Sequence, residues 1–344
     1  MKPPILLAFL LFFTLSLAGC ELPRPEPVFP LEHIGLLQDN QIAHSVSLTK
    51  DTYRILSISG GGPNGAWTAG VVNGWKEPQF DAIVGVSTGA MAATPIYLNR
   101  LDDLKSAYTE TDNSDIYNFI KLCDMFDTTS LSTNRKLEAT VNKYLSDEVI
   151  DAVAKEYIST RRLLVVCATD LDTGRVVSWN LGVLAANKDY VTYRKAILAS
   201  AAIPIVFPPV EIGTHLFVDG GARANVFLPQ GILRAAHDAN KKALVQILLN
   251  TMPSELGEGK TPRSLGGIAT RSVSTLIDSA TIGNLTYIQA KCLEFGFEFY
   301  VGQPAPGTPL EGYDFNREKM TAIYECGLLW GKNPKWQNQF VPNY

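Results

Sequence analysis

The sequence predicts an α/β fold, a three-layer α/β/α sandwich around a mainly parallel sheet, and three observations carry this prediction. Apolar strand-like segments alternate with helical segments along the chain, which is the pattern of an α/β protein. Residues 53–86 hold a strand, a helix and a second strand, and a βαβ unit of this kind makes its two strands parallel. A serine flanked by glycines, Ser87, directly follows the second strand.

The composition is that of a globular protein without the footprint of a nucleic-acid binder. The chain has 344 residues, of which 46% are hydrophobic and 19% are charged, and a domain of this size folds without disulfides. The 30 basic and 34 acidic residues are interspersed and give a net charge of −4. Because no basic block is present, we expect no nucleic-acid partner.

The N-terminus predicts a signal peptide over residues 1–19. An uncharged apolar run from Ile5 to Ala18 follows Lys2. As a helix this run would span about 21 Å, which is short of the roughly 30 Å hydrocarbon core of a bilayer. A run of this length behind a basic residue is typical of a secretion signal and not of a membrane span.

The end of this segment, Leu17-Ala18-Gly19-Cys20, resembles the lipobox of bacterial lipoproteins. The resemblance implies that Cys20 is acylated and anchors the protein to a membrane; ordinary secretion with cleavage after Ala18 is the alternative. Residues 20–45 begin with closely spaced prolines, which favour an extended tether. Glu21 follows the cysteine, and the resemblance to Gram-negative lipoproteins then implies the cell envelope, at the periplasmic face of the outer membrane.

No repeat or long linker divides residues 46–344, so we expect one domain there. Residues 100–160 are polar with helical patterning and predict an insertion, either a lid or a plain solvated element. The expected strands cover residues 53–59, 80–86, 163–169, 176–180, 216–218 and 243–250. The expected helices cover residues 64–75, a segment after Ser87, 264–295, and 317–330, the last capped by Asn316 and stopped by Gly331.

The segment Gly85-Val86-Ser87-Thr88-Gly89 is a G-x-S-x-G motif between an apolar strand and a helix. This is the context of a nucleophile elbow, in which the serine sits on a strained turn at the end of the strand. Side chains at the flanking positions would collide with neighbouring backbone, which explains the glycines. The free amides of the following helix also point toward the serine. We therefore predict that Ser87 is a nucleophile.

The glycine cluster at residues 60–65 admits two interpretations. Gly60, Gly62 and Gly65 match the G-x-G-x-x-G fingerprint of dinucleotide-binding proteins. That interpretation needs an acid at the end of the second strand, whereas Asp81 lies at its start. Consecutive glycines also leave amides free to stabilise an oxyanion. We therefore expect no nucleotide, and an oxyanion hole made by the amides of Gly60, Gly61 and Gly62, with Gly61 and Gly62 as the donors.

The residues alone leave the base that would activate Ser87 open. His215 precedes an expected strand and His237 sits on a polar helix face, so both are more typical of structural histidines. Asp219 ends an apolar run before two glycines, as either a turn residue or a base. A carboxylate must be desolvated and close to the serine to act as a base. No histidine is paired with a second ligand at helical spacing, so we expect no metal and no cofactor.

The ordered motifs Ser-Gly-Gly-Gly-x-x-Gly, G-x-S-x-G and Asp-Gly-Gly resemble those of the patatin-like phospholipases. The resemblance covers residues 53–230 and includes Ala199-Ser200-Ala201-Ala202-Ile203-Pro204 and Phe207-Pro208-Pro209. It implies the family's fold and a dyad without histidine, in which Ser87 is the nucleophile and Asp219 the base. Two positions depart from the family pattern. Ser59 stands where plant members have Asp, and Asn64 stands where many members have a cation that contacts a phosphate head group.

The resemblance implies a membrane-anchored lipid acyl hydrolase of the phospholipase A or lysophospholipase type, which forms an acyl-enzyme. A general esterase or neutral-lipid lipase, and a non-catalytic lipid-binding envelope protein, are the alternatives. Trp67 follows the glycine loop and is expected either in the acyl channel or, more in keeping with its helix, in the core. The remaining cysteines, expected as inert free thiols, are Cys123, Cys167, Cys292 and Cys326.

Overall fold

A computed structural model describes residues 45–75, 79–118, 130, 132–253, 261 and 263–341 of the chain. The expected signal peptide, the acylation site at Cys20, most of the expected tether and Cys123 lie outside the described residues.

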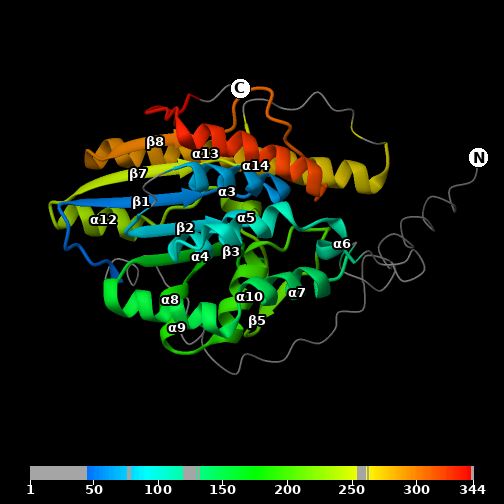
Figure 1. Cartoon of the computed structure of the whole chain (residues 1–344), viewed down its shortest axis with the longest axis horizontal. Helices are drawn as coiled ribbons and strands as arrows, with labels where there is room; N and C mark the ends of the chain where they lie inside the picture. The colour runs from blue at the N-terminus through cyan, green and yellow to red at the C-terminus, as the bar shows by residue number, and fades with distance from the viewer. Residues whose placement is uncertain are drawn as a thin grey trace, which may run out of the picture.

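The described residues form a mixed eight-stranded sheet in the order β5-β6-β3-β2-β1-β7-β8, with β4 on the other edge of β3 (Figure 1). The strands are β1 (Thr52–Ile58), β2 (Ala82–Val86), β3 (Leu163–Asp170), β4 (Arg175–Asn180), β5 (Val210–Ile212), β6 (His215–Asp219), β7 (Lys242–Leu248) and β8 (Glu298–Gly302). β1, β2, β3, β7 and β8 run parallel, while β4, β5 and β6 join the β3 end antiparallel. The predicted α/β fold with a mainly parallel sheet is therefore confirmed.

Helices cover both faces of this sheet because successive β1 side chains point in opposite directions. Leu56 and Ile58 enter one buried cluster, with α3, α4, α5, α7, α10 and α14, whereas Tyr53 and Ile55 enter a second with α12 and α13. The helices are α3 (Gly65–Gly74), α4 (Thr88–Tyr97), α5 (Leu101–Thr109), α6 (Asn113–Ile116), α7 (Arg135–Tyr144), α8 (Asp147–Thr160), α9 (Leu181–Ala186), α10 (Tyr190–Ser200), α11 (Gly221–Ala224), α12 (Gln230–Asp238), α13 (Leu265–Phe295) and α14 (Arg317–Lys332), with a short 3-10 turn η2 (Gly62–Asn64).

One edge of β3 is shared by two strands that meet end to end. β2 pairs with the first part of β3 up to Val86 opposite Cys167, and β6 pairs with the last part, with Asp219 opposite Ala168. β4 pairs with residues on both sides of this junction, so it occupies the other edge. β2 and β6 therefore run toward each other along one edge of β3. Ser87 follows the end of β2 at the point where β6 ends in Asp219.

Helices α3 and α14 lie side by side with their backbones in close contact (Figure 1). Each carries two glycines four residues apart, Gly70 and Gly74 on α3 and Gly327 and Gly331 on α14. A Cβ at Gly70 would lie 2.0 Å from a carbonyl oxygen of α14, and one at Gly327 would lie 2.1 Å from a carbonyl oxygen of α3. The prediction that Gly331 stops the last helix is wrong, because this glycine is inside α14 and serves the contact.

The helix contact predicts a position-dependent cost of adding a methyl group. We expect Gly327→Ala to lower the free energy of unfolding by about 1 to 3 kcal/mol, because the overpacked helices must separate. Gly283→Ala on α13 is the matched control, since nothing lies within 4 Å of its Cβ position. It is expected to leave stability unchanged or raise it by up to about 1 kcal/mol through helix propensity. Urea titrations of both variants measure the difference; equal midpoints would contradict the contact.

Candidate active site

Ser87 occupies a tight turn between β2 and α4. Its backbone has a φ of 56° and a ψ of −123°, a left-handed conformation that residues other than glycine rarely adopt. A Cβ at Gly85 would lie 2.3 Å from the carbonyl oxygen of Gly89, and a Cβ at Gly89 would lie 2.4 Å from that of Ile58. Both glycines are therefore needed to close the turn, as the motif predicts. The serine side of this turn is buried, with Ser87 only 5% exposed.

The Asp219 side chain meets Ser87 at the junction of β2 and β6. Its carboxylate accepts a hydrogen bond of 2.7 Å from the Gly221 N–H, and it lies next to the Ser87 side chain. Burial raises the pKa of Asp219 from its ordinary 3.8 to about 7, and the interactions with Ser87 and Gly221 offset part of that rise. The structure thus places next to the serine a carboxylate that titrates near neutral pH, where a general base works best.

Residues at and just after the end of α10 accept hydrogen bonds from the backbone at both Ser87 and Asp219. The Ser87 N–H donates to Ser200 Oγ at 2.9 Å, and the Gly220 N–H donates to the Ser200 carbonyl at 3.3 Å. The Asp219 N–H donates to the carbonyl of Ala202 at 2.8 Å. Ser200, which is fully buried, therefore fixes the relative position of the two strand ends. The segment Ala199 to Pro204 is part of the family resemblance, but its sequence does not predict that Ser200 binds the backbone of Ser87 and Gly220.

The three candidate amides of the glycine loop differ in their hydrogen bonding. The Gly60 N–H donates to the carbonyl of Asn225 at 3.2 Å, so this amide positions the loop. Within the described part of the chain, the N–H groups of Gly61 and Gly62 have no hydrogen-bond partner. Their φ angles of 155° and 55° require glycine. Of the three predicted donors, Gly61 and Gly62 are thus the two whose amides are free to stabilise an oxyanion.

Asn250, just after β7, binds the residue that precedes the glycine loop. This role was not predicted from the sequence. Its N–H donates to Ser59 Oγ at 2.9 Å, and its side-chain amide donates to the Ser59 carbonyl at 2.8 Å. Its Oδ1 accepts from the Thr68 hydroxyl at 2.7 Å. These bonds give Ser59 a structural role in this chain. A polar residue after a strand gives no sequence signal for such a contact.

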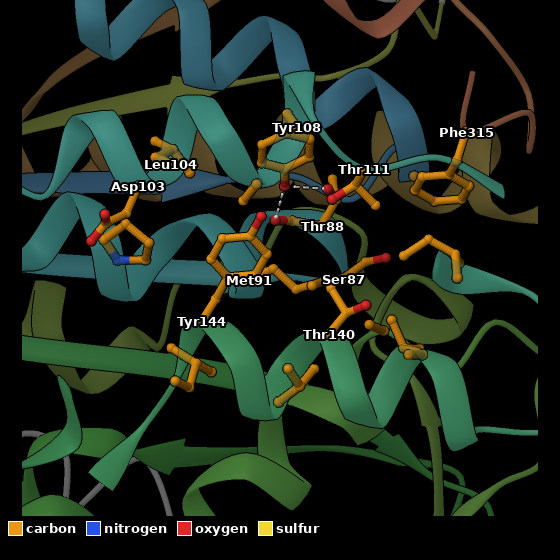
Figure 2. A pocket seen from close by; sticks show the side chains of 18 of the residues that line it. Ser87, Thr88, Met91, Asp103, Leu104, Tyr108, Thr111, Thr140, Tyr144 and Phe315 are labelled. Carbon is orange, nitrogen blue, oxygen red and sulfur yellow. Dashed lines mark hydrogen bonds between the residues drawn. The ribbon is translucent and has the colours of Figure 1, made fainter. Parts of the chain in front are cut away.

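An apolar cavity opens from Ser87 between α4, α5 and α7 (Figure 2). In this view Ser87 and Phe315 lie at one end, Asp103 lies at the other, and Met91 lies between them. Further apolar side chains line it, namely Leu104, Ile116, Leu137, Val141, Leu145, Val149, Ile203, Phe207 and Met320. Helices from the expected insertion at residues 100–160 therefore form a wall of this cavity.

A second cavity, with more polar side chains than the first, opens on the Asp219 side of Ser87. Its polar lining residues besides Ser87 are Asn64, Asp219, Asn225, Thr251, Ser274, Asp278, Glu311 and Tyr313. Asn64 is fully engaged there: its amide nitrogen donates to the Glu311 carbonyl and its Oδ1 accepts from the Glu311 N–H, both at 2.8 Å. Asn113 on α6 binds the same C-terminal segment, accepting from the Phe315 N–H at 2.8 Å. The segment 311–315 thus closes over the glycine loop.

The two histidines weighed as bases lie elsewhere. His215 begins β6, at the opposite end of that strand from Asp219, and its Nδ1 lies 2.8 Å from Asp170 Oδ2. His237 is half-exposed on α12 beside Asp238. Neither histidine lines the two cavities at Ser87. Of these three candidates, Asp219 is the one that lies next to the Ser87 side chain and lines a cavity with it.

The structure also places Trp67, three of the cysteines and a group of possible metal ligands. Trp67 is buried and packs edge-to-face on Trp330 at 5.3 Å, and it does not line the apolar cavity. Cys167, Cys292 and Cys326 are free thiols. Asp170, Asp172 and His215, which are not at helical spacing in the sequence, bring ligand atoms within 4.8 Å of one another. The Asp170 carboxylate in this group already accepts from the Asp172 N–H and the Thr173 hydroxyl.

A family model described as patatin-like phospholipase matches residues 56–232, slightly more than half of the chain. The chain also aligns with the crystal structure of VipD from Legionella pneumophila, with a TM-score of 0.41 and 10% identity, over 82% of this chain and 66% of that chain. It thus spans just under two thirds of the VipD chain. No curated protein matches it significantly in sequence.

The raised pKa of Asp219 predicts a stability trade-off. Between pH 3.8 and about 7 the folded protein holds a proton that the unfolded chain releases, so ionisation of Asp219 costs stability as the pH rises. We expect Asp219→Asn to be more stable than wild type at pH 8, by up to roughly 4 kcal/mol, and the gain to vanish near pH 4. Thermal unfolding across this range measures it. Asp238→Asn on the surface should show no such trend; a flat difference for Asp219→Asn would contradict the burial argument.

Proposed function

The chain belongs to the patatin-like phospholipase family, and we propose that it hydrolyses lipid carboxylic esters through a dyad of Ser87 and Asp219. Membership of this family supports lipid ester hydrolysis in general. One observation carries the finer proposal: a buried serine in a strained turn lies next to a buried carboxylate with a pKa of about 7. Such a carboxylate is an adequate base at neutral pH without a histidine.

The proposed first half-reaction is acyl transfer to Ser87. Its Oγ attacks the ester carbonyl while Asp219 accepts the hydroxyl proton. The amides of Gly61 and Gly62 stabilise the negative charge that develops on the carbonyl oxygen, a contribution typically worth about 3 to 4 kcal/mol per donor. Collapse of the tetrahedral intermediate breaks the ester bond, and the proton on Asp219 passes to the leaving alcohol.

The second half-reaction regenerates the enzyme with water. Asp219, again ionised, takes a proton from the water that attacks the acyl-enzyme, and the same amides stabilise the second oxyanion. The fatty acid then leaves and Ser87 recovers its proton. No step in this scheme needs a group beyond the residues of this chain and water.

The two cavities suggest how the substrate lies. The apolar cavity between α4, α5 and α7 suits an acyl chain, and the polar cavity beside Asp219 suits the alcohol and the incoming water. We propose a phospholipase A or lysophospholipase reaction. A neutral ester is the second candidate, because both polar groups of the Asn64 side chain are bound to the Glu311 backbone and no cation stands at that position.

The dyad predicts matched losses of activity and a defined pH profile. We expect Ser87→Ala and Asp219→Asn each to lower kcat/KM on a soluble short-chain ester by at least about a thousandfold, with the fold retained. In wild type, kcat/KM should rise with pH to a plateau above about 7, because the base works only when ionised. Full activity of Asp219→Asn would redirect the base to another group.

A labelling experiment separates this enzyme from a non-catalytic lipid-binding protein of the same fold. A fluorophosphonate probe should modify Ser87 in wild type, and mass mapping should locate the adduct on that residue. His215→Ala, at the far end of β6, is the control and should label like wild type. A wild-type chain that never reacts would favour the binding protein.

We propose that acylation of Cys20 holds this enzyme at a membrane of the bacterial envelope. Within the described residues, no helix is long and apolar enough to cross a membrane. The lipobox resemblance at Leu17 to Cys20 supports a covalent anchor, and several acyl chains bind far more firmly than one. Glu21 supports the periplasmic face of the outer membrane in a Gram-negative host.

The anchor predicts a change of fractionation on losing one thiol. We expect Cys20→Ala to move the protein from the membrane pellet to the soluble fraction after a high-salt wash, because no acyl chain is then attached. Immunoblots of the fractions measure this, with Cys326→Ala as a control that should stay in the pellet. A Cys20→Ala protein that still pellets would contradict acylation as the anchor.

A further inference from the structure

A large cavity lies at the end of the sheet opposite Ser87. It opens near the amino ends of β1, β2 and β3, beside the start of β1 and the end of α8 (Figure 1). Its charged lining residues are Arg54, Lys155, Glu156 and Arg162. The cavity is therefore positive on balance, in a chain whose net charge is −4.

Two of these cations have no acidic partner within the described residues. Arg162 is paired with Glu156 at 3.0 Å and also donates to backbone carbonyls. Arg54 Nε is buried and has no hydrogen-bond partner among the described atoms, and neither Arg54 nor Lys155 forms an ion pair with a described residue. Because Nε is closed off from solvent, an anionic ligand in the cavity would bind the two outer nitrogens of this guanidinium, which have no acceptor among the described residues.

The buried acid beside the start of β1, Asp81, is already engaged. The Asp81 carboxylate accepts from the backbone N–H of Arg54 at 2.8 Å and from Lys50 Nζ at 2.6 Å. The Arg54 guanidinium instead lies over the Phe80 ring, 5.5 Å from its centroid. Stacking of this kind orients the planar guanidinium and leaves its outer nitrogens free for a bidentate acceptor.

The rest of the lining combines apolar and aromatic side chains with the polar Gln79, Asn99 and Ser159. Trp75, Ile96, Tyr97, Leu98 and Leu101 contribute to the same cavity. A bare inorganic anion gains nothing from such a surface, whereas an amphiphile with an anionic head buries its apolar part there. We propose that this cavity binds the phosphate head group of a phospholipid through Arg54 and Lys155.

The cavity lies at the end of the domain where the N-terminal segment enters, which fits a membrane ligand. It also lies far from the proposed active site. Ser47, Thr49 and Lys50, which lie near the start of the described chain, line a neighbouring cavity that shares Glu156 and Arg162 with this one. The chain therefore arrives from its N-terminal side at this end of the domain. Helix α4 separates Ser87 from Leu98 by roughly 15 Å, so the site is independent of the proposed dyad.

The test measures lipid binding to the full chain carrying Ser87→Ala, which prevents hydrolysis. Titration calorimetry would compare dihexanoyl phosphatidylglycerol below its micelle concentration with dihexanoylglycerol, which lacks the phosphate, and with inorganic phosphate. We expect phosphatidylglycerol to bind more tightly than either. Arg54→Gln and Lys155→Gln should each weaken its binding roughly tenfold by removing a charged hydrogen bond, without changing the binding of dihexanoylglycerol.

The controls make each outcome decisive. Arg175→Gln removes the same charge from an exposed position on β4 and should bind like the parent chain. Lys155 is exposed on α8, so its variant decides the matter if Arg54→Gln fails to fold. With Ser87 present, Lys155→Gln should hydrolyse a soluble ester at the wild-type rate. Unchanged phosphatidylglycerol binding in Lys155→Gln, or inorganic phosphate binding as tightly as the lipid, would overturn the proposal.

Discussion

The pairing of two strands along one edge of β3 is the constraint on which the site depends. β2 and β6 approach each other from opposite directions and stop at neighbouring residues of β3, so Ser87 and Asp219 meet although they are far apart in the chain. A strand that paired with residues 168–170 of β3 in the parallel direction would begin beside Ser87, and its last residue would lie away from the elbow. The antiparallel pairing of β6 with β3 is thus what brings the carboxylate to the serine.

Burial gives the carboxylate its chemistry and also makes the site costly. Removing Asp219 from water raises its pKa to about 7, which suits the proposed role as a base at neutral pH but penalises its ionised form in the folded state. The left-handed backbone of Ser87 adds strain. The bonds from Ser200 and Ala202 to both strand ends offset this cost by holding the geometry. The site is therefore stabilised from α10, an element outside the elbow itself.

Local patterns predicted the parts of this protein in which neighbouring residues decide the structure. The βαβ unit and the elbow at Ser87 fall in this class, because strand alternation and flanking glycines are visible within a few residues. Asn250 and Ser200 were missed as functional positions because their bonds reach residues distant in the chain. The stop predicted at Gly331 failed for the same reason, since a glycine that ends a helix and one that packs against another helix look alike in sequence. The cations of the far cavity are likewise scattered along the chain.

The C-terminal part of the chain, beyond the family match, contributes to the candidate site. Helix α14 packs closely against α3, and the segment 311–315, just before α14, lies over the glycine loop. Asn64 joins this segment by both donating to and accepting from the backbone of Glu311. A lysine or arginine there can donate but cannot accept, so the cation found at this position in many family members would leave the Glu311 N–H without its bond. The neutral residue at position 64 and the covering C-terminal segment are therefore one structural feature.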